Sequence, residues 1–395
     1  MIRERAFLQV LAGMLYCLLL VGCDSTLRDQ IELYVSIKNG GIIYVDGTSG
    51  NDANPGTRER PKASIQNAIE LAAALMDEGQ VWVAEGTYVI QKTLVVREGI
   101  SIFGEYEVPG WTRNRQLQPT TIIQGDGIDT VIKPERGVTT ATVIDGFTII
   151  AASEDTVTCI WCDRASPTIR FTMLNSVAGS EDTIGIFNQY SEPFILSNTI
   201  NAGQGSMKAR GILNQGASPR IWNNLIYGLG DNSTFIAISN NDNSDAVIQN
   251  NTIRAGTTSG GIGIYCSQSN CVIENNILFT DGVGCGIYEV DSSALPVRVR
   301  NNDLYACAPV YQYDGGSCTT VAQMESYLSD APNNIVAVDN TSDNPDFENQ
   351  SGLDWHLKAT SSIKDAGLDL SVYFTHDRED VPRTFAWSIG AYEQD

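Results

Sequence analysis

TIGIFNQYSEPFILSNTI (residues 183–200) and ARGILNQGASPRIWNNLI (residues 209–226) are two copies of one pattern, offset by 26 residues. Both copies place isoleucine at the same three positions, which are Ile186, Ile195 and Ile200 in the first copy. Both also keep an Asn-Gln pair after the first isoleucine and a proline shortly before the second. A fixed period of this length is typical of a solenoid, in which successive units of chain stack on each other.

Three aliphatic ladders extend the period far beyond these two copies. Each ladder has six members at spacings of 23 to 27 residues, so chance is a poor explanation. The first ladder is Ile160, Ile186, Ile212, Ile238, Ile264 and Ile287; the second is Ile169, Ile195, Ile221, Ile248, Ile273 and Val299; the third is Leu174, Ile200, Ile226, Ile253, Leu278 and Leu304.

Each period therefore contains three short apolar strand segments. Helical repeats need two long amphipathic helices per unit, and a 26-residue period rich in Asn, Gly and Thr does not supply them. Closing every period into one coil stacks its three segments on those of the next coil, about 4.8 Å away. The sequence predicts an all-β parallel β-helix of three parallel sheets, in which the ladders form continuous interior columns.

Asparagines recur with the same period, three residues past the second ladder and two residues past the first. Asn tolerates left-handed backbone geometry, and its amide can bond the same group one coil away. We interpret these columns as structural rather than as a ligand site. The columns are Asn198, Asn224, Asn251, Asn276 and Asn302, and Asn188, Asn214 and Asn240.

The ends of the predicted β-helix need caps, because an open end exposes strand edges and core. Residues 64–76 are predicted to form an amphipathic α-helix over the first coil, with Ile69 and Leu75 among the residues of its apolar face. Residues 315–340 break the period, and a short helix is expected near residues 321–328. We divide the chain into a signal peptide (1–22), a tether (23–41) and one β-helix domain (42–395), itself composed of a cap (42–80), coils (81–310) and an irregular closing segment (311–395).

The N-terminus is predicted to be a lipoprotein signal. Arg3 and Arg5 precede an apolar run that ends Leu20-Val21-Gly22-Cys23. This ending resembles a bacterial lipobox, and the resemblance implies cleavage before Cys23 and lipidation of its thiol. We therefore expect a protein that is exported, lipid-anchored in the bacterial cell envelope and monomeric. An uncleaved membrane anchor is the alternative, and neither reading gives the membrane leaflet.

The remaining seven cysteines lie in a chain whose predicted export permits disulfides. Cys266–Cys271 and Cys307–Cys318 are candidate local bridges, although spacing does not fix the pairing. Cys159 and Cys162 have the spacing of a metal or redox pair. Zinc would require further ligands nearby, and both histidines lie far along the chain.

The formal net charge of −22 bears on the partners of the protein. It argues against nucleic acid, which needs clustered Lys and Arg, and against simple electrostatic capture of an acidic glycan. An acidic surface suits divalent cations, of which Ca²⁺ is the candidate cofactor, or it serves solubility alone.

Several segments resemble bacterial right-handed β-helix proteins of the pectin-lyase-like superfamily, with an opening segment of the DUF1565 type. The resemblance spans about residues 42–395 and implies the fold far more specifically than an activity. It places His356 in a recurrent closing motif, which favours a structural role for this side chain. The segments are Tyr44-Val45-Asp46-Gly47, Glu85-Gly86-Thr87-Tyr88, Ile144-Asp145-Gly146-Phe147, Asp354-Trp355-His356-Leu357 and Ile389-Gly390-Ala391-Tyr392-Glu393.

The sequence contains no recognisable catalytic motif, since neither histidine has the Gly neighbours found in polygalacturonase-like hydrolases. One charged cluster does have suggestive spacing: Asp155 and Glu181 are 26 residues apart, as are Asp182 and Lys208. Carboxylates on adjacent coils could share calcium or divide acid and nucleophile roles, and a neighbouring Lys could act as a base. A solvated loop with ordinary ion pairs is the alternative.

Three functional hypotheses remain open. The first is a non-catalytic envelope protein that binds polysaccharide or another surface ligand, with Trp161, Phe187, Tyr265 and Tyr288 stacking on sugars if they face outward. The second is a polysaccharide lyase or glycoside hydrolase for an acidic glycan that uses the charged cluster. The third is a passive structural or adhesin-like surface protein.

Overall fold

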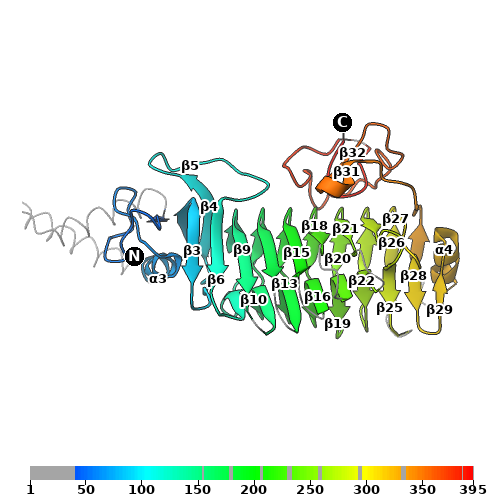
Figure 1. The fold of residues 1–395 in the computed structure, drawn as a ribbon, viewed down its shortest axis with the longest axis horizontal. Helices are drawn as coiled ribbons and strands as arrows, with labels where there is room; N and C mark the ends of the chain where they lie inside the picture. The colour runs from blue at the N-terminus through cyan, green and yellow to red at the C-terminus, as the bar shows by residue number, and fades with distance from the viewer. Residues whose placement is uncertain are drawn as a thin grey trace, which may run out of the picture.

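The computed structural model describes residues 41–394, apart from residues 154, 178–180, 205–207, 229–233, 257–259, 292–295, 331–334 and 385. The predicted signal peptide and Cys23 therefore lie outside the described residues. The chain winds into a right-handed parallel β-helix, with its coils stacked along the long axis of the molecule (Figure 1). The predicted fold class is confirmed.

Three long sheets form the walls of the β-helix, and most coils contribute one strand to each. Sheet 1 consists of β1 (Ile42–Val45), β2 (Gly79–Ala84), β4 (Ile100–Glu107), β8 (Val143–Asp145), β11 (Thr168–Arg170), β14 (Phe194–Leu196), β17 (Arg220–Trp222), β20 (Val247–Gln249), β23 (Val272–Glu274), β26 (Arg298–Arg300) and β30 (Val336–Val338), with β5 (Thr112–Arg113) paired to β4. Sheet 2 consists of β7 (Thr130–Ile132), β10 (Val157–Asp163), β13 (Asp182–Gln189), β16 (Lys208–Gln215), β19 (Thr234–Asn241), β22 (Ile262–Cys266), β25 (Cys285–Glu289), β28 (Tyr311–Tyr313) and β29 (Gly316–Cys318). Sheet 3 consists of β3 (Gly86–Ile90), β6 (Thr121–Gly125), β9 (Thr148–Ala152), β12 (Met173–Val177), β15 (Thr199–Gln204), β18 (Leu225–Tyr227), β21 (Thr252–Arg254), β24 (Ile277–Phe279) and β27 (Asp303–Tyr305).

The three predicted ladders are the interior columns of these sheets. Ile186 pairs with Ile160 on one side and with Ile212 on the other, and the second and third ladders pair in the same way. All their members are buried. The 26-residue period thus arises because each coil must return an aliphatic side chain to the same place in the core.

In each coil, a pair of adjacent residues, usually Asn-Asn, forms the corner between the sheet-1 strand and the sheet-3 strand. The two residues of a pair have different roles. The first residue of each pair adopts the left-handed conformation that turns the corner, as Asn223 (φ 56°) and Asn250 (φ 50°) do. The second points inward, and its side chain bonds the next coil; Asn198 Nδ2, for example, donates to Asn224 Oδ1 at 3.0 Å. Asn188 Nδ2 likewise donates to Asn214 Oδ1 at 2.8 Å in the other column. The structural interpretation of these columns is confirmed.

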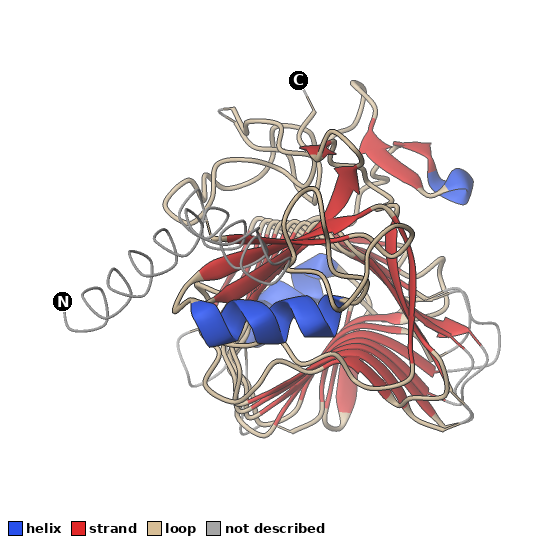
Figure 2. Cartoon of the chain, turned by 90° about the vertical axis from the view of Figure 1, so that its left-hand side faces the viewer, coloured by secondary structure: helices blue, strands red, loops and turns tan. Residues whose placement is uncertain are grey.

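Both ends of the β-helix are covered by a helix. At the N-terminal end α3 (Ile65–Leu75) buries Ile65, Ala68, Ile69 and Ala72 against the first coil, and Figure 2 shows it lying across that end. Leu75, which the sequence places on the apolar face, is the last residue of α3 and is 45% exposed. At the other end α4 (Val321–Ser329) buries Met324 and Leu328. None of the helices in the described part of the chain is long and apolar enough to cross a membrane.

The last part of the predicted closing region, residues 343–394, folds back over the outside of the coils (Figure 1). From here on, the closing segment means these residues. It contains β31 (Phe347–Asn349), the short 3-10 helix η1 (Gln350–Gly352) and β32 (Asp354–Leu357). Its Trp355 packs on Tyr227 and Phe279 of sheet 3. His356 bonds Asp354 at 2.6 Å and Glu379 at 3.1 Å, and these carboxylates, Glu379 foremost, raise the pKa of His356 to about 9. His356 therefore connects β32 with the part of the closing segment near Glu379.

All seven cysteines of the described chain are buried free thiols, so neither candidate disulfide is formed. Cys266 Sγ and Cys271 Sγ lie 3.6 Å apart. Burial raises the pKa of the Cys159 thiol to about 12, and the pKa of Cys162 is raised further for the same reason. These thiols pack in the core as small apolar groups.

Candidate functional site

The β5 loop (residues 108–120) and the closing segment both project from the same side of the β-helix (Figure 1). A cavity of about 380 Å³ lies between residues 114–117 of the loop and residues 378–380 of the closing segment. A second cavity of about 340 Å³ continues over sheet 1 toward Trp222 and residues 373–377. Phe171 and Asp380 line both cavities, which we together call the groove.

Aromatic side chains line the sheet-1 part of the groove. Trp222 faces outward from β17, beside Leu196 of the preceding coil, and its ring centroid lies 5.3 Å from that of Phe374 and 6.0 Å from that of Tyr373. The indole Nε1–H of Trp222 is buried and has no hydrogen-bond partner among the described residues. The guanidinium of Arg220 lies 4.9 Å from the ring centroid of Phe194. This lining offers aromatic ring faces, which are groups that stack on sugars.

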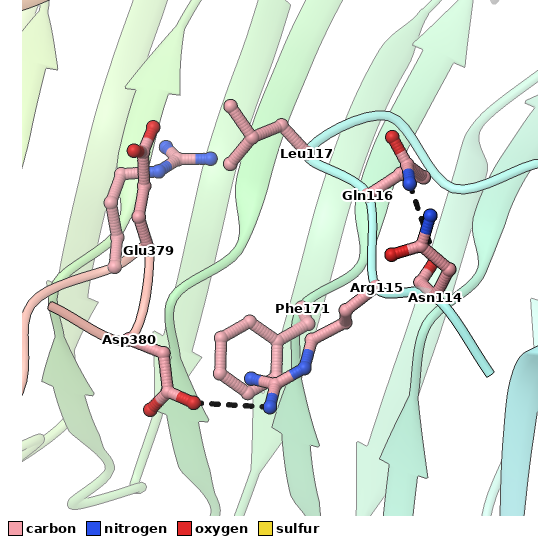
Figure 3. Close-up of a pocket in the computed structure, with 8 residues that line it drawn as sticks. Asn114, Arg115, Gln116, Leu117, Phe171, Glu379 and Asp380 are labelled. Carbon is pink, nitrogen blue, oxygen red and sulfur yellow. Dashed lines mark hydrogen bonds and ion pairs between the residues drawn. The ribbon is translucent and has the colours of Figure 1, made fainter.

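An ion pair joins the two walls of the groove. Arg115 Nη2, from the β5 loop, lies 3.1 Å from Asp380 Oδ2 of the closing segment. The Arg115 guanidinium also stacks over Phe171, 4.0 Å from the ring centroid (Figure 3). Since both charged side chains are about half exposed, this pair contributes little to stability and can exchange for a ligand contact.

A buried charge network anchors the β5 loop to sheet 1. Arg113 pairs with Asp145, and Arg170 Nε lies 2.7 Å from the other oxygen of the same carboxylate. Glu105 Oε1 accepts from the backbone N–H of Gln116 at 2.6 Å. Burial raises the pKa of Glu105, even though Arg113 lowers it. The network ties the loop that forms one wall of the groove to sheet 1, because Glu105 and Asp145 are buried carboxylates that bond groups of the loop.

The predicted charged cluster lies elsewhere, at the start of the sheet-2 strands. Asp182 pairs with Lys208 in the register of β13 and β16, and the Lys208 backbone N–H donates to Glu181 O at 3.2 Å. Asp182 Oδ2 is 2.5 Å from Arg210 Nη1. Asp155, Glu181 and Lys208 are exposed. No group of three or more His, Cys, Asp or Glu in the described ranges is arranged to hold a metal ion.

The four predicted stacking residues face outward from sheet 2. Trp161 and Phe187 are half-buried and stack with ring centroids 5.6 Å apart, and Lys133 Nζ lies 3.4 Å from the centroid of Trp161. Tyr265 and Tyr288 meet edge to face at 5.7 Å. Two coils that carry Leu213 and Ser239 separate the pairs. The four rings therefore form two separate patches.

A family model described as "Protein of unknown function (DUF1565)" matches residues 48–298. The chain belongs to this family. The match covers most of the coils and the N-terminal cap. None of the curated proteins compared with the chain matches it.

Among solved structures, the chain is similar to pectate lyase Pel9A, with 13% identity, a TM-score of 0.52, and coverage of 90% of this chain and 96% of that one. A pectin methylesterase from Aspergillus niger matches at 13% identity and a TM-score of 0.43, over 77% and 90% of the two chains. A rhamnogalacturonan lyase matches at 13% identity and a TM-score of 0.41, over 75% and 95%. At this identity the likeness to the pectate lyase shows the fold of this DUF1565 member and nothing about its activity.

The residues of the groove were missed by sequence reasoning. Arg115 and Asp380 are 265 residues apart, and no period relates them. Trp222 was visible as one residue past the second ladder, a position that alternation places outside the coil. That signal gives the direction of the side chain, but the docking of the closing segment beside it is not encoded in the repeat.

Proposed function

We propose that this protein is an exported, lipid-anchored component of the bacterial cell envelope that binds polysaccharide in the groove without transforming it. The observation that carries the proposal is the groove itself, in which Trp222, Phe171 and Tyr373 surround a hollow that runs between two projecting walls. Coils about 4.8 Å apart present side chains at a rise close to that of a sugar unit, which suits a repeating polymer.

The proposal is tested with a glycan array and two matched tyrosine variants. Tyr373 is 47% exposed and lies in the groove, whereas Tyr265 lies in a sheet-2 patch. Loss of one stacked ring costs about 1 kcal/mol, or about fivefold in affinity. We expect Tyr373→Ala to weaken binding by this factor and Tyr265→Ala to leave it unchanged. The reverse pattern would move the site to the sheet-2 patches, and binding to no array member would favour a passive surface protein.

A lyase or hydrolase at the charged cluster is the second candidate, favoured by the pairing of Asp182 with Lys208 on adjacent coils. Incubation with uronate polymers, monitored for new unsaturated or reducing ends, tests this activity. A Lys208→Ala variant that retains full activity would remove the cluster as the site.

The lipid anchor is tested at Cys23. Cys23→Ala is expected to abolish incorporation of labelled fatty acid and to release the protein from the membrane fraction, since one thiol carries the lipid. A variant that remains labelled and membrane-bound would contradict the anchor.

A further inference from the structure

Arg378 is a buried arginine that lines the first cavity. It is 3% exposed, and its Nη2 donates to Thr199 Oγ1 at 2.7 Å. Its guanidinium carbon lies 5.3 Å from the ring centroid of Tyr392, and its backbone N–H donates to Ala391 O at 3.1 Å. The side chain is therefore held between sheet 3 and the closing segment.

The rest of this guanidinium lacks partners. Nε and Nη1 of Arg378 are buried and make no hydrogen bond, and within the described ranges no carboxylate forms an ion pair with this residue. Buried charged donors without partners cost several kcal/mol, so they are rare unless a ligand completes them.

The acidic neighbours of Arg378 are already engaged. The Asp377 carboxylate accepts from the backbone N–H groups of Glu379, Val381 and Glu393 at 2.8 to 2.9 Å. Glu379 lies 3.1 Å from His356, which is protonated at neutral pH because its pKa is about 9. Asp380 pairs with Arg115. The charge of Arg378 also contributes to lowering the pKa of Glu379, although no ion pair joins the two side chains. Among the described residues that line this cavity, Arg378 is thus the arginine without an ion-pair partner.

The cavity beside Arg378 has the size and walls of a small-ligand site. Its 380 Å³ falls within the usual range for such pockets. Figure 3 shows Phe171 with Arg115 against it on one side, Leu117 and Gln116 on the β5 loop, and Glu379 and Asp380 opposite. An apolar ring face next to unpartnered charged donors suits a sugar that carries an anionic group.

We propose that the cavity beside Arg378 binds an acidic sugar unit, with the carboxylate accepting the unpartnered Nε–H and Nη1–H of Arg378 and the ring lying against Phe171. This inference rests on the proposed function and names the class of its ligand. It also refines the expectation from net charge, because in a chain of net charge −22 the lining of this cavity sets Arg115 and Arg378 against Glu379 and Asp380 and is formally neutral.

The test is calorimetric titration of the mature chain with D-glucuronate, D-glucose and inorganic sulfate. We expect D-glucuronate to bind at least tenfold more tightly than the other two ligands. Arg378→Met is expected to remove this preference. Arg136→Met is the control and is expected to leave it unchanged, because the 65% exposed side chain of Arg136 pairs with Asp163 at the end of β10. Equal affinity for glucuronate and glucose, or equal affinity for glucuronate and sulfate, would overturn the inference.

Stability separates a ligand-binding arginine from a structural one. Arg378→Met removes a buried charge that has no ion-pair partner among the described residues, so its melting temperature is expected to equal or exceed that of the parent. A clear loss of melting temperature together with retained glucuronate binding would show a structural role. Leu117→Glu is the second variant: Leu117 is 51% exposed on the cavity rim, and a carboxylate there should abolish glucuronate binding without unfolding the protein.

These results are distinguishable from those that test the proposed function. Polysaccharide binding that depends on Tyr373 but shows no preference for acidic units leaves the function standing and refutes the role of Arg378. Glucuronate binding that depends on Arg378, with no polysaccharide bound, supports the subsite and refutes the proposal that the groove binds a polymer.

Discussion

At the scale of single residues, the interior asparagines of the corner do more than turn the chain. Asn251 Nδ2 donates to Ile221 O at 2.8 Å, to Gln249 O at 3.1 Å and to Asn276 Oδ1 at 3.0 Å. Its Oδ1 accepts from the backbone N–H of Asn224 at 2.9 Å. Each amide therefore satisfies buried backbone groups that the short strands leave unpaired at the corner.

Asn251→Ala is expected to lower the free energy of unfolding by about 3 kcal/mol or more, because it leaves several buried backbone groups without partners. Urea denaturation followed by circular dichroism measures this change. The matched control is Asn270→Ala, at an exposed position, which is expected to change stability by less than about 0.5 kcal/mol. Equal effects of the two substitutions would contradict the role of the ladder.

Glu289 is a second residue whose burial has a measurable consequence. Its side chain is fully buried. Oε2 accepts from the Tyr311 hydroxyl at 2.7 Å, and Oε1 has no hydrogen-bond partner in the part of the chain that the structure describes. Burial raises the pKa of Glu289 from 4.5 to about 7. The folded state therefore holds this proton to a higher pH than the unfolded state does.

The contribution of Glu289 to stability is expected to be fully present below pH about 4.5, to decline as the pH rises toward about 7, and to be constant above that. The loss amounts to about 3 kcal/mol. Chemical denaturation across this range should show a shallower decline in Glu289→Gln than in the parent. The exposed Glu348→Gln serves as the control. Parallel curves for Glu289→Gln and the parent would show that Glu289 is not the group responsible.

At the scale of elements, the helices protect the ends of the stack, where core side chains of the terminal coils would otherwise meet water. Ile69 of α3 is fully buried, whereas Leu75 on the same helix is 45% exposed. The two positions allow a matched comparison within one helix, since both lose an aliphatic side chain.

Ile69→Asp is expected to destabilise the N-terminal end by at least about 3 kcal/mol, because it buries an unpaired carboxylate. The exposed coil edge should then cause self-association, which light scattering detects. Leu75→Asp is expected to leave both properties unchanged. If Leu75→Asp self-associates to the same extent, the association depends on the solubility of α3 and not on its role as a cap.

At the scale of the whole molecule, the closing segment is fastened to the corner of the coils by buried polar contacts. Arg383 and Glu393 form an ion pair at 2.9 Å and are almost completely inaccessible. Arg383 Nη2 also donates to Asn223 Oδ1 at 2.9 Å, so the pair connects the segment to the β-helix. The groove depends on this attachment, since the closing segment forms one of its walls.

Arg383→Met is expected to cost about 3 to 5 kcal/mol, because it leaves Glu393 buried without a counter-ion. Hydrogen exchange should increase in residues 343–394 while the coils remain protected. Adding Glu393→Leu is expected to restore much of the loss. A double variant no more stable than Arg383→Met would show that the hydrogen bonds of Arg383, rather than its charge pairing, fasten the segment.

The sequence by itself determined the β-helix, its register and the helices at its ends. Ile186, Ile195 and Ile200 each pair with an isoleucine 26 residues later, because every coil packs against the same core. A requirement that recurs in every coil is visible as a period in the sequence. The sequence left open whether Trp161 and Phe187 face outward, and the structure shows both half-buried and stacked on each other.

Only the tertiary structure decided the groove. The contact of Arg115 with Asp380 and the position of Arg378 above Thr199 depend on how a non-repeating segment docks across the coils. Docking of this kind arises from specific long-range contacts rather than from a periodic pattern, so no spacing in the chain predicts it. The repeat therefore gives the scaffold from sequence alone, whereas the site requires the folded arrangement of its two projecting walls.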